Sequence, residues 1–542
     1  MKEITPSQSI DIGKNWKQGV LPGYENEVAN LLTAKKFEEL KEFFTNPYGR
    51  VTAVKQNPRD ITSAVLTARL SRAGQRDVTE LFWNEFRTKT GETVADKILN
   101  EFGDDSVRED ASGYLFIRDV SVLTSMQAFR HPLITGIEAS TRYINWGDLP
   151  IEDFAVLPEK ISDDPEAKEI YLRAVNDTWQ TYKNLWPQVW DHVTKSTPRE
   201  EDQPEAAYKK AVKGAVCDAL RGLLPLGTKT NFAIHANYRA LSELIMNLRA
   251  SDLTETRDVA NEMAVELKKV NPVFIGVVDS DHGTEWVQHQ NKTNKTLKKF
   301  GEGGKGRSNG ENLNVAVEIL NGSWSKDVLR EALVSKNGNL VGYGEQELAE
   351  EFLPNGALRK LLKDLGNART NRRHKLPDVV NSAVVRIKVE NLSFGAFKDL
   401  NRHRPLLFKS EPDWSGRRGY VIPDIIRKIG GKVEASYRLT QEGLLLSKKK
   451  LEEKFPEESK LLLSHGTKTA YEFISGLAEA FWIVEIRSGQ SGNPEYREIA
   501  IEAYKGIIEA SAAFQDLGHF VDEKKYELGR IQEAVRTELK EK

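Results

Sequence analysis

An internal repeat is the feature of this sequence that most restricts its fold. Three markers recur in the same order in both halves: a predicted strand, turn and amphipathic helix; a Ser nine positions ahead of an Arg-His pair; and a segment that opens with GTKT. The paired segments are residues 51–70 and 315–334, 120–132 and 392–405, and 227–251 and 466–489. Three such pairs in one order indicate duplication of a structural unit.

The third pair predicts helices. Both copies run from GTKT into a helix that ends at Arg249 or Arg487. Apolar residues at helical spacing mark the side that faces the core. They are Leu241, Leu244, Ile245 and Leu248 in the first copy, and Ala470, Phe473, Ile474, Leu477, Phe481 and Val484 in the second. We interpret these stripes as core rather than as ligand pockets.

The chain has 542 residues, which exceeds what one hydrophobic core usually supports, and its composition is that of a globular protein. We expect an α+β fold made of two related units in tandem, each a sheet packed with helices. The first unit is assigned residues 1–290 and the second residues 314–542, with a Gly-, Asn- and Lys-rich linker over 291–313. Two such units would share a pseudo-twofold interface, where ligand sites form easily.

Charge and cysteine content restrict the partners. The 78 basic and 80 acidic residues nearly cancel, so nucleic acid is not expected as a partner. No run approaches the roughly 20 apolar residues of a membrane span and no signal-peptide core is present, so no membrane partner is expected. The single cysteine, Cys217, excludes an intramolecular disulfide and favours the cytoplasm. We interpret Cys217 itself as a packed small hydrophobe.

Two donor-rich segments follow the second marker of the repeat. They are Arg130 and His131 in the first copy, and Arg402, His403 and Arg404 in the second. An arginine fork grips a phosphate with two hydrogen bonds and an adjacent histidine adds a donor, so the segments suit a phosphorylated ligand. Salt bridges between the units are the alternative interpretation.

Glu138, Ser140 and Arg142 alternate downstream of the first Arg-His pair. In extended backbone their side chains would lie on one face. A carboxylate, a hydroxyl and a guanidinium on one edge can bind a sugar hydroxyl and a phosphate together. An ordinary polar strand is the alternative interpretation.

These segments resemble the flavin-dependent thymidylate synthases, over most of both halves. The signature of that family is Arg-His-Arg, a Ser, then Asn-Glu-x-Ser-x-Arg-Tyr, and RHPLITGIEASTRY at 130–143 aligns across it. Further motifs of the family are echoed by GDDSVREDAS at 103–112, RGLLPL at 221–226, NYR at 237–239 and LR at 248–249. The combination is specific, whereas each short motif alone is weak.

The resemblance implies reductive methylation of dUMP to dTMP with methylenetetrahydrofolate and NADPH, through FAD. It implies that a dUMP-type nucleotide is surrounded by Gln127, Arg130, Glu138, Ser140, Arg142, Arg221 and Arg249. It implies that FAD is contacted by Ser106, Glu109, Arg130, His131, Asn237 and Arg239, and partly by Arg402, His403 and Arg404. Ser140 would orient the nucleotide and Arg249 would stabilise charge on the uracil, so these two are the candidate catalytic residues. No metal site is expected.

The two copies depart from the family pattern in opposite ways. Pro132 and Ile137 replace an Arg and an Asn of the signature, and Asp104 and Asp110 stand where two His are expected. The second copy keeps Arg-His-Arg but lacks Glu-x-Ser-x-Arg. We therefore expect a composite site, with the nucleotide held by the first copy and flavin phosphates partly by the second, in a homodimer that mimics the family's tetramer.

Two alternatives stay open. One is a homologue without catalysis that survives as a module binding nucleotide or flavin. The other is an enzyme that installs a different one-carbon group on a uracil nucleotide. The departures at Pro132 and Asp104 motivate the first alternative, since a flavin pyrophosphate would lose donors there.

Overall fold

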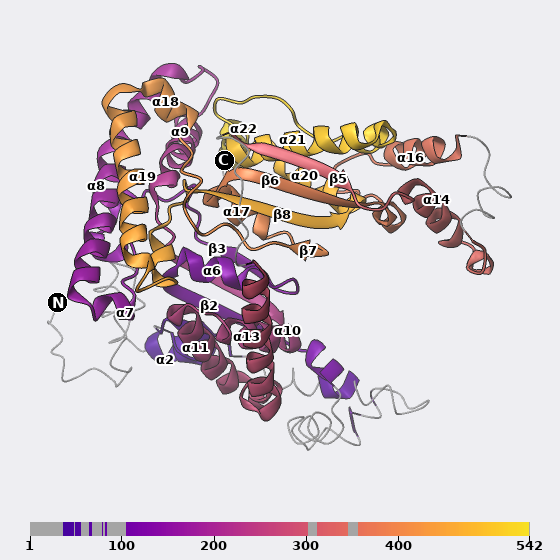
Figure 1. The fold of residues 1–542 in the computed structure, drawn as a ribbon, viewed down its shortest axis with the longest axis horizontal. Coiled ribbons are helices and arrows are strands. Elements are labelled where there is room, and N and C mark those ends of the chain that lie inside the picture. The colour runs from indigo at the N-terminus through magenta and orange to yellow at the C-terminus, as the bar shows by residue number, and fades with distance from the viewer. Residues whose placement is uncertain are drawn as a thin grey trace.

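Two antiparallel sheets of four strands organise the computed structural model, which describes residues 36–47, 49–55, 64–67, 79, 82–83, 105–301, 312–344 and 356–540. The first sheet has the order β1-β2-β4-β3, formed by Val51–Ala53, Ser112–Ser121, Lys229–Asn237 and Thr135–Glu138. The second has the order β5-β6-β8-β7, formed by Asn314–Ile319, Val384–Ser393, Lys468–Gly476 and Phe408–Lys409. The strand order is the same in both sheets, which confirms two α+β units in tandem (Figure 1).

Each unit combines its sheet with helices. In the first unit they are α2 (Lys36–Phe43), α6 (Val122–Ala128), α7 (Glu159–Ser162), α8 (Pro165–Ser196), α9 (Glu205–Leu220), α10 (Tyr238–Arg249), α11 (Thr254–Val270), α12 (Pro272–Ile275) and α13 (Asp281–Gly301). In the second they are α14 (Trp324–Val334), α16 (Ala357–Asn367), α17 (Phe394–Asn401), α18 (Asp424–Ile429), α19 (Gly431–Glu452), α20 (Leu477–Arg487), α21 (Pro494–Ala510) and α22 (Ile531–Lys540). Short 3-10 helices include η5 (Asp105–Glu109), η8 (Arg221–Leu223) and η12 (Glu458–Leu462).

The first marker of the repeat is confirmed in the second unit, where β5 is followed by α14. In the first unit β1 is present, but residues 56–63 and 68–70 of this marker lie outside the described residues. Helices α6 and α17 begin at the serines of the second marker. The markers therefore lie on equivalent elements wherever both copies are described.

The segments after GTKT begin as strands. Residues of β4 and β8 alternate between buried and partly exposed positions, because each strand lies between two neighbours and turns one face to the core. The helical interpretation of Ala470, Phe473 and Ile474 is therefore wrong, since these residues lie on β8. The predicted helices follow as α10 and α20, and they end at Arg249 and Arg487 as predicted.

The boundary between the units differs from the predicted linker over 291–313. Helix α13 extends to Gly301, so residues 291–301 are helical. The polar sequence between Gly283 and Gly301 contains neither glycine nor proline, and its lysines and glutamines favour a helix, so polarity alone does not end it. Residues 302–311 lie outside the described residues, and the limits 1–290 and 314–542 stay a prediction.

Matching backbone segments join the two units. Leu226 N donates to Leu463 O over 2.6 Å, and His465 N donates to Leu224 O over 2.8 Å. Counted from the glycine of GTKT, Leu226 corresponds to His465 and Leu224 to Leu463, so a pseudo-twofold axis relates the two bonds. A second related pair of bonds joins the GTKT glycines to the opposite unit. Equivalent segments of the two copies thus face each other.

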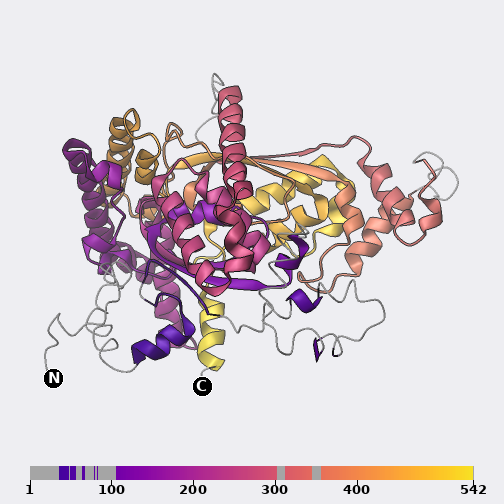
Figure 2. The same cartoon turned by 90° about the horizontal axis from the view of Figure 1, so that it is seen from below.

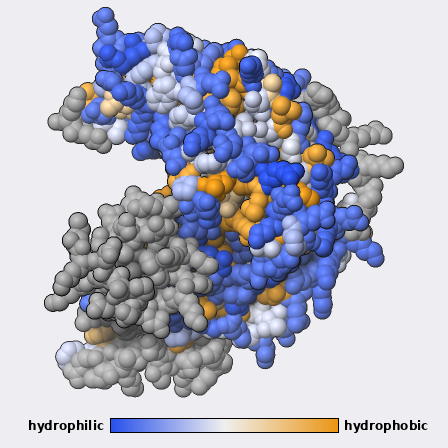
Figure 3. All heavy atoms as spheres, turned by 90° about the vertical axis from the view of Figure 1, so that its left-hand side faces the viewer, coloured by the Kyte–Doolittle hydropathy of each residue, from blue (hydrophilic) through white to orange (hydrophobic). Residues whose placement is uncertain are grey.

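The long helices α8 and α19 lie side by side at one end of the molecule (Figures 1 and 2). One buried apolar cluster includes Val122 and Tyr171 of the first unit and Val385 and Phe481 of the second, so the units share a core. The end that α8 and α19 form presents a mostly hydrophilic surface, with apolar residues gathered near its middle (Figure 3). Over the described part of the chain, no helix is both long and apolar enough to cross a membrane.

Candidate active site between the two units

The helices that follow β2 and β6 begin in the same way. Ser121 caps α6 and Ser393 caps α17, each accepting a hydrogen bond from the backbone N–H three residues further on. The carboxylate of Glu255 accepts from the backbone and hydroxyl of Ser121, and that of Glu495 accepts from those of Ser393. Burial raises the pKa of Glu495. This shared contact fixes the start of each helix, and with it the residues that the helix carries to the interface.

Arg142 comes from a turn that follows β3. The strand ends at Glu138, and Arg142 N donates to Ser140 Oγ, so the predicted extended run over these residues is wrong beyond Glu138. The guanidinium of Arg142 forms two hydrogen bonds to Asp218 of α9, at 2.7 and 2.9 Å, and Arg530 approaches the same carboxylate at 3.1 Å. Burial acts to raise the pKa of Asp218, but the arginines outweigh it and hold that pKa below its usual value.

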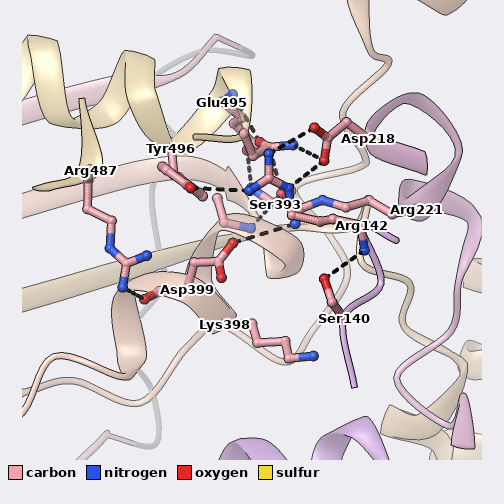
Figure 4. Close-up of polar contacts among 12 residues, drawn as sticks. Ser140, Arg142, Asp218, Arg221, Ser393, Lys398, Asp399, Arg487, Glu495 and Tyr496 are labelled. Carbon is pink, nitrogen blue, oxygen red and sulfur yellow. Dashed lines mark hydrogen bonds and ion pairs between the residues drawn. The ribbon is translucent and has the colours of Figure 1, made fainter. Parts of the chain in front are cut away.

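Arg221 and Arg487 meet Asp399 beside this ion pair (Figure 4). Arg221 of η8 lies 3.5 Å from Asp399 Oδ2, and Arg487 of α20 donates to the backbone oxygen of Asp399 at 2.8 Å. Arg142 and Arg487 both approach the ring of Tyr496, at 5.7 and 5.4 Å from its centre. Burial opposes ionisation of Asp399, but the surrounding cations keep its pKa below the ordinary value. Arginines of both units thus converge on one region.

Lys398 and Glu138 form a further contact between the units. Lys398 lies on α17 and is 9% exposed, and its Nζ is 2.9 Å from Glu138 Oε1. The same oxygen accepts from the hydroxyls of Ser125 and Thr230, at 2.7 and 3.3 Å. We call the residues gathered here the arginine cluster: Glu138, Ser140, Arg142 and Arg221 of the first unit, and Lys398, Asp399 and Arg487 of the second.

Several buried polar atoms in and beside the cluster have no hydrogen-bond partner among the described residues. They are Arg221 Nη2, Glu138 Oε2, His465 Nε2 and Asn401 Oδ1. His465 Nδ1 lies 2.9 Å from Leu224 O, which assigns the donor role to that nitrogen and leaves Nε2 as an acceptor. Burial and the nearby Lys398 lower the pKa of His465 to about 3, so its ring is neutral at pH 7. Native proteins rarely leave such atoms unpaired, so the cluster suits a polar ligand.

Arg249 does not join the cluster to which the sequence assigned it. Its guanidinium donates to Asn261, to the backbone oxygen of Val278 and to Asp279, all in the first unit. Arg487, the matching residue at the end of α20, contacts Asp399 instead. The reason is that the site is built across the interface, so the helix of the second unit supplies the arginine.

Gln127 and Arg130 also lie away from the cluster contacts. Gln127 Oε1 accepts from Ser251 Oγ at 2.7 Å. Arg130 donates to the backbone oxygens of Lys409 and Ser410, each at 3.3 Å, and pairs with a carboxylate of the second unit. Of the predicted nucleotide residues, the structure therefore brings together Glu138, Ser140, Arg142 and Arg221.

The predicted flavin residues of the first unit form a chain of ion pairs. Arg239 lies 2.6 Å from Glu109 and 3.5 Å from Glu243, and His131 Nε2 lies 3.6 Å from Glu243. A hydrogen bond to His131, together with Arg239, lowers the pKa of Glu243 despite burial. Arg239 is nearly half exposed, so this chain is open to solvent.

The remaining flavin candidates of the first unit have local surroundings. Asn237 caps α10 by accepting from Ala240 N at 2.8 Å, so its side-chain oxygen holds the helix. Ser106 lies exposed on η5, the element that carries Glu109. Asp104, one of the predicted departures from the family, lies outside the described residues.

The Arg-His-Arg triplet of the second unit reaches the first unit at two points. Arg402 donates to the backbone oxygen of Gly136 and Arg404 to that of Ile134, and the Arg402 guanidinium lies 4.8 Å from the centre of the Phe129 ring. His403 Nε2 accepts from Arg487 Nε at 2.8 Å, so His403 supports the arginine cluster. Burial and the adjacent Arg487 hold the pKa of His403 well below its ordinary value. Arg402 and Arg404 thus lie near the segment that carries His131, whereas His403 lies beside the arginine cluster.

Strand register identifies the counterparts of the cluster residues. Ile234 and Phe473 both stand seven positions after the glycine of their GTKT segment. β3 pairs Gly136 with Ile234, and β7 pairs Lys409 with Phe473, so Gly136 corresponds to Lys409. Two, four and six positions further on, the counterparts of Glu138, Ser140 and Arg142 are Glu411, Asp413 and Ser415. This register matches Pro132 with Pro405. Because Arg130 and His131 match Arg402 and His403, Arg404 is an insertion in the second unit relative to the first.

The counterpart of the arginine cluster is acidic. Asp413 stands where the first unit has Ser140, and Ser415 stands where it has Arg142. Glu411 pairs with Arg130 at 3.1 Å, and Asp413 pairs with Arg418 at 3.0 Å. Compared with the arginine cluster, this place gains the carboxylate of Asp413 and lacks the guanidinium of Arg142, so it is less favourable for a phosphate. We call this second place, formed by Gln127, Arg130, Glu411, Asp413 and Ser415, the acidic counterpart.

Sequence reasoning missed Lys398 and Asp399. They lie five and six positions after Ser393, as Met126 and Gln127 lie after Ser121. Aligning the two serines places Asp399 opposite Gln127. Because Gln127 was already assigned to the nucleotide, this alignment could have identified Asp399 as a candidate. Cys217 was interpreted correctly: it is fully buried, and burial raises the pKa of its thiol to about 12.

Comparisons with known proteins agree with the duplicated architecture. A family model described as "Thymidylate synthase complementing protein" matches residues 52–273 and 336–511. A UPF0159 protein of Chlamydia muridarum is 27% identical over 528 residues, which are 92% of this chain and 97% of that protein. A flavin-dependent thymidylate synthase of Mycobacterium marinum is 31% identical over 174 residues, 32% of this chain and 64% of that protein. A solved structure of thymidylate synthase X from Helicobacter pylori with FAD and dUMP aligns at 15% identity and a TM-score of 0.30, over 41% of this chain and 95% of that chain.

Proposed function

We propose that this chain, which belongs to the family of thymidylate synthase complementing proteins, binds a uracil nucleotide at the arginine cluster and methylates it with the help of a flavin. The proposed reaction is reductive methylation of dUMP to dTMP, with methylenetetrahydrofolate as the one-carbon donor and NADPH as the reductant of FAD. The chemistry implied by the family needs no protein nucleophile. A buried Cys217 with a raised pKa agrees with that requirement.

The observation that carries the proposal is the convergence of arginines from both units beside unpaired polar atoms. Arg142 and Arg221 come from the first unit and Arg487 from the second, and Asp399 lies among all three. Arg221 Nη2 is buried without a partner among the described residues. Guanidinium groups in such a place favour a ligand that carries both a phosphate and carbonyl oxygens.

Each residue is given the role that its contacts allow. Asp218 holds the guanidinium of Arg142 in one orientation, and Arg142 N is bonded to Ser140 Oγ, so these two residues are proposed to orient the phosphate. Arg221 and Arg487 are proposed to stabilise the charge that develops on the uracil as its C5 becomes nucleophilic. Arg487 takes over the role that the sequence suggested for Arg249.

The donors proposed for FAD gather around one segment, residues 129–137. His131 and Arg239 share Glu243 through contacts of 3.6 and 3.5 Å, and Arg402 and Arg404 reach the segment from the second unit. A phosphate can replace the shared carboxylate as the partner of these cations, so the donor set fits the pyrophosphate of FAD. When bound, FAD supplies the hydride, and the chain supplies orientation and charge.

A homodimer is proposed as the assembly. Apolar side chains next to the edge strands β3 and β7 are exposed, among them Leu133 at 60%, Ile137 at 79% and Leu407 at 71%. Exposed apolar residues along an edge strand favour docking of another chain. Light scattering on the purified protein is expected to give twice the chain mass. A cytoplasmic location stays a prediction, which fractionation of cells tests.

The first experiment concerns the ligands. Protein expressed with riboflavin should carry a yellow chromophore or bind added FAD, and calorimetry with dUMP should give one site per chain, because the acidic counterpart is less favourable for a phosphate. With methylenetetrahydrofolate and NADPH added, label at C5 of dUMP should be released and the product should be heavier by one methylene. Protein that binds neither FAD nor dUMP contradicts the proposed function.

A module that binds nucleotide or flavin without catalysis is the second candidate. One observation favours it: the arginines already hold Asp218 and Asp399, and such ion pairs can serve the interface alone. Binding of dUMP without release of the C5 label would identify such a module. The remaining alternative, transfer of another one-carbon group, would show as a different product mass, since a hydroxymethyl group is heavier than a methyl group.

A further inference from the structure

Lys398 differs in kind from its counterpart in the first unit. It lies five positions after the cap serine Ser393, as Met126 lies five positions after Ser121. Met126 is a buried apolar residue at 3% exposure, whereas Lys398 brings an ammonium group to an equivalent place at 9% exposure. Burying an ammonium is unfavourable unless it is paired and hydrogen-bonded. A lysine in this place therefore indicates a specific partner.

Its protein partner satisfies only part of this requirement. Nζ of Lys398 lies 2.9 Å from Glu138 Oε1, while Glu138 Oε2 has no hydrogen-bond partner among the described residues. An ammonium group has three N–H donors, and each carboxylate oxygen is an acceptor. Lys398 extends from α17 toward the segment of the first unit that carries Ser140 (Figure 4). The pair thus presents a donor next to an acceptor within the arginine cluster.

A neighbouring donor and acceptor match one edge of uracil. That edge carries a carbonyl oxygen beside a ring N–H, so the base can accept from Lys398 and donate to Glu138. Cytosine carries the reverse pattern, an amino group beside a bare ring nitrogen. An ammonium cannot accept a hydrogen bond and an ionised carboxylate cannot donate one, so cytosine held in the orientation of uracil would leave both groups unpaired.

We propose that Lys398 and Glu138 read the base of the nucleotide and select uracil over cytosine. The inference rests on the proposed nucleotide site and deepens it by naming the residues that recognise the base. One of them comes from each unit, so the reading pair exists only because the units meet. The unpaired Nη2 of Arg221 suits the second carbonyl of uracil, and the phosphate is left to Arg142 and Ser140.

The central test exchanges Lys398 for the residue that the first unit carries. Wild-type protein should bind dUMP roughly 100-fold more tightly than dCMP, because a site built to hydrogen-bond one base leaves its groups unpaired with the other. Lys398→Met should reduce that ratio to less than about tenfold, since only Glu138 still discriminates. Calorimetry measures both affinities. Inhibition of dUMP binding by inorganic phosphate should change less than about twofold, because Arg142 is untouched.

A second variant keeps the test decisive if Lys398→Met does not fold. Lys398→Gln carries an amide that can present either an N–H or an oxygen, so only Glu138 should still discriminate and the preference for dUMP should again fall to less than about tenfold. The matched control is Met126→Leu, a change of nearly equal volume at the equivalent place, which should keep the full preference for dUMP.

The outcomes separate the two proposals. Wild-type protein that binds dUMP and dCMP equally overturns the inference but not the nucleotide site. Either Lys398 variant with an undiminished preference overturns it as well. Wild-type protein that binds neither nucleotide overturns the proposed function, and the inference falls with it.

Discussion

The arginine cluster and the acidic counterpart occupy equivalent places in the two units but differ in the charged groups that they carry. In the arginine cluster, Ser140 and Arg142 follow the edge strand β3. In the acidic counterpart, Asp413 and Ser415 follow the edge strand β7 of the other sheet. The backbone around both is alike, since the same strands pair in the same order. The difference therefore lies in side chains on a conserved framework.

Duplication within one chain allows this divergence. In an oligomer of identical subunits every substitution appears at each equivalent site, so two sites related by symmetry stay the same. In a tandem chain, Lys398 can differ from Met126 and Asp399 from Gln127 without changing their counterparts. One place can then keep ligand-binding residues while the other becomes a structural contact.

Removing the carboxylate that holds the arginines is expected to have the largest effect. Asp218→Ala leaves Arg142 and Arg530 buried without their partner, which should lower the free energy of unfolding by roughly 3 kcal/mol or more. The matched change in the acidic counterpart, Asp413→Ala, breaks a more exposed pair and should cost about 1 kcal/mol or less. Denaturant unfolding followed by circular dichroism measures both. Equal losses would remove the distinction between the two places.

The second prediction concerns the arginines that end α10 and α20. Arg487→Ala should weaken dUMP binding by about 30-fold or more, because it removes a charged partner from the cluster. Arg249→Ala should change the affinity by less than about twofold, since Arg249 bonds within its own unit. Calorimetry on both variants decides the matter. A large loss with Arg249→Ala alone would restore the assignment made from the sequence.

The third prediction tests where the two copies agree. Glu255→Ala and Glu495→Ala each remove the carboxylate that binds a cap serine, and each should cost about 1–2 kcal/mol of unfolding free energy. The two losses should agree within about 1 kcal/mol, because the serine contacts are equivalent and Glu255 accepts one further hydrogen bond, from Thr124 Oγ1. Unfolding curves of the paired variants provide the comparison. A clear difference would mean that the serine contacts serve different purposes in the two units.

The smallest expected effect is a dependence on pH that belongs to the second unit. The pKa of His465 lies at about 3 and that of His403 lies well below its ordinary value, mainly because of burial. The unfolded state therefore binds more protons below pH 6.5, so stability is complete above that pH and falls as the pH drops through it. At pH 5.5 each histidine should cost about 1 kcal/mol relative to pH 8. His465→Gln should remove its share, and an unchanged pH profile in that variant would contradict the assignment.

Much of the fold was predictable from local pattern. Alternating and helical spacings gave β5 with α14, and the ends of α10 and α20 at Arg249 and Arg487. Prediction failed where spacing was ambiguous, as at Phe473, which fits a helical stripe but lies on a central strand. It failed again at Arg142, because one turn after β3 redirects the side chain toward Asp218. Such errors arise because neighbouring strands, rather than local sequence, decide which apolar run is a sheet.

The sequence by itself determined that the chain is a duplicated α+β unit, and that arginine, serine and carboxylate groups recur beside its repeat markers. Only the tertiary structure decided which copy of each residue enters the candidate site: Arg487 rather than Arg249, and Asp399 rather than Gln127. The physical reason is that the site lies across a pseudo-twofold interface. Both units contribute side chains there, and long-range packing, not position along the chain, selects the partners.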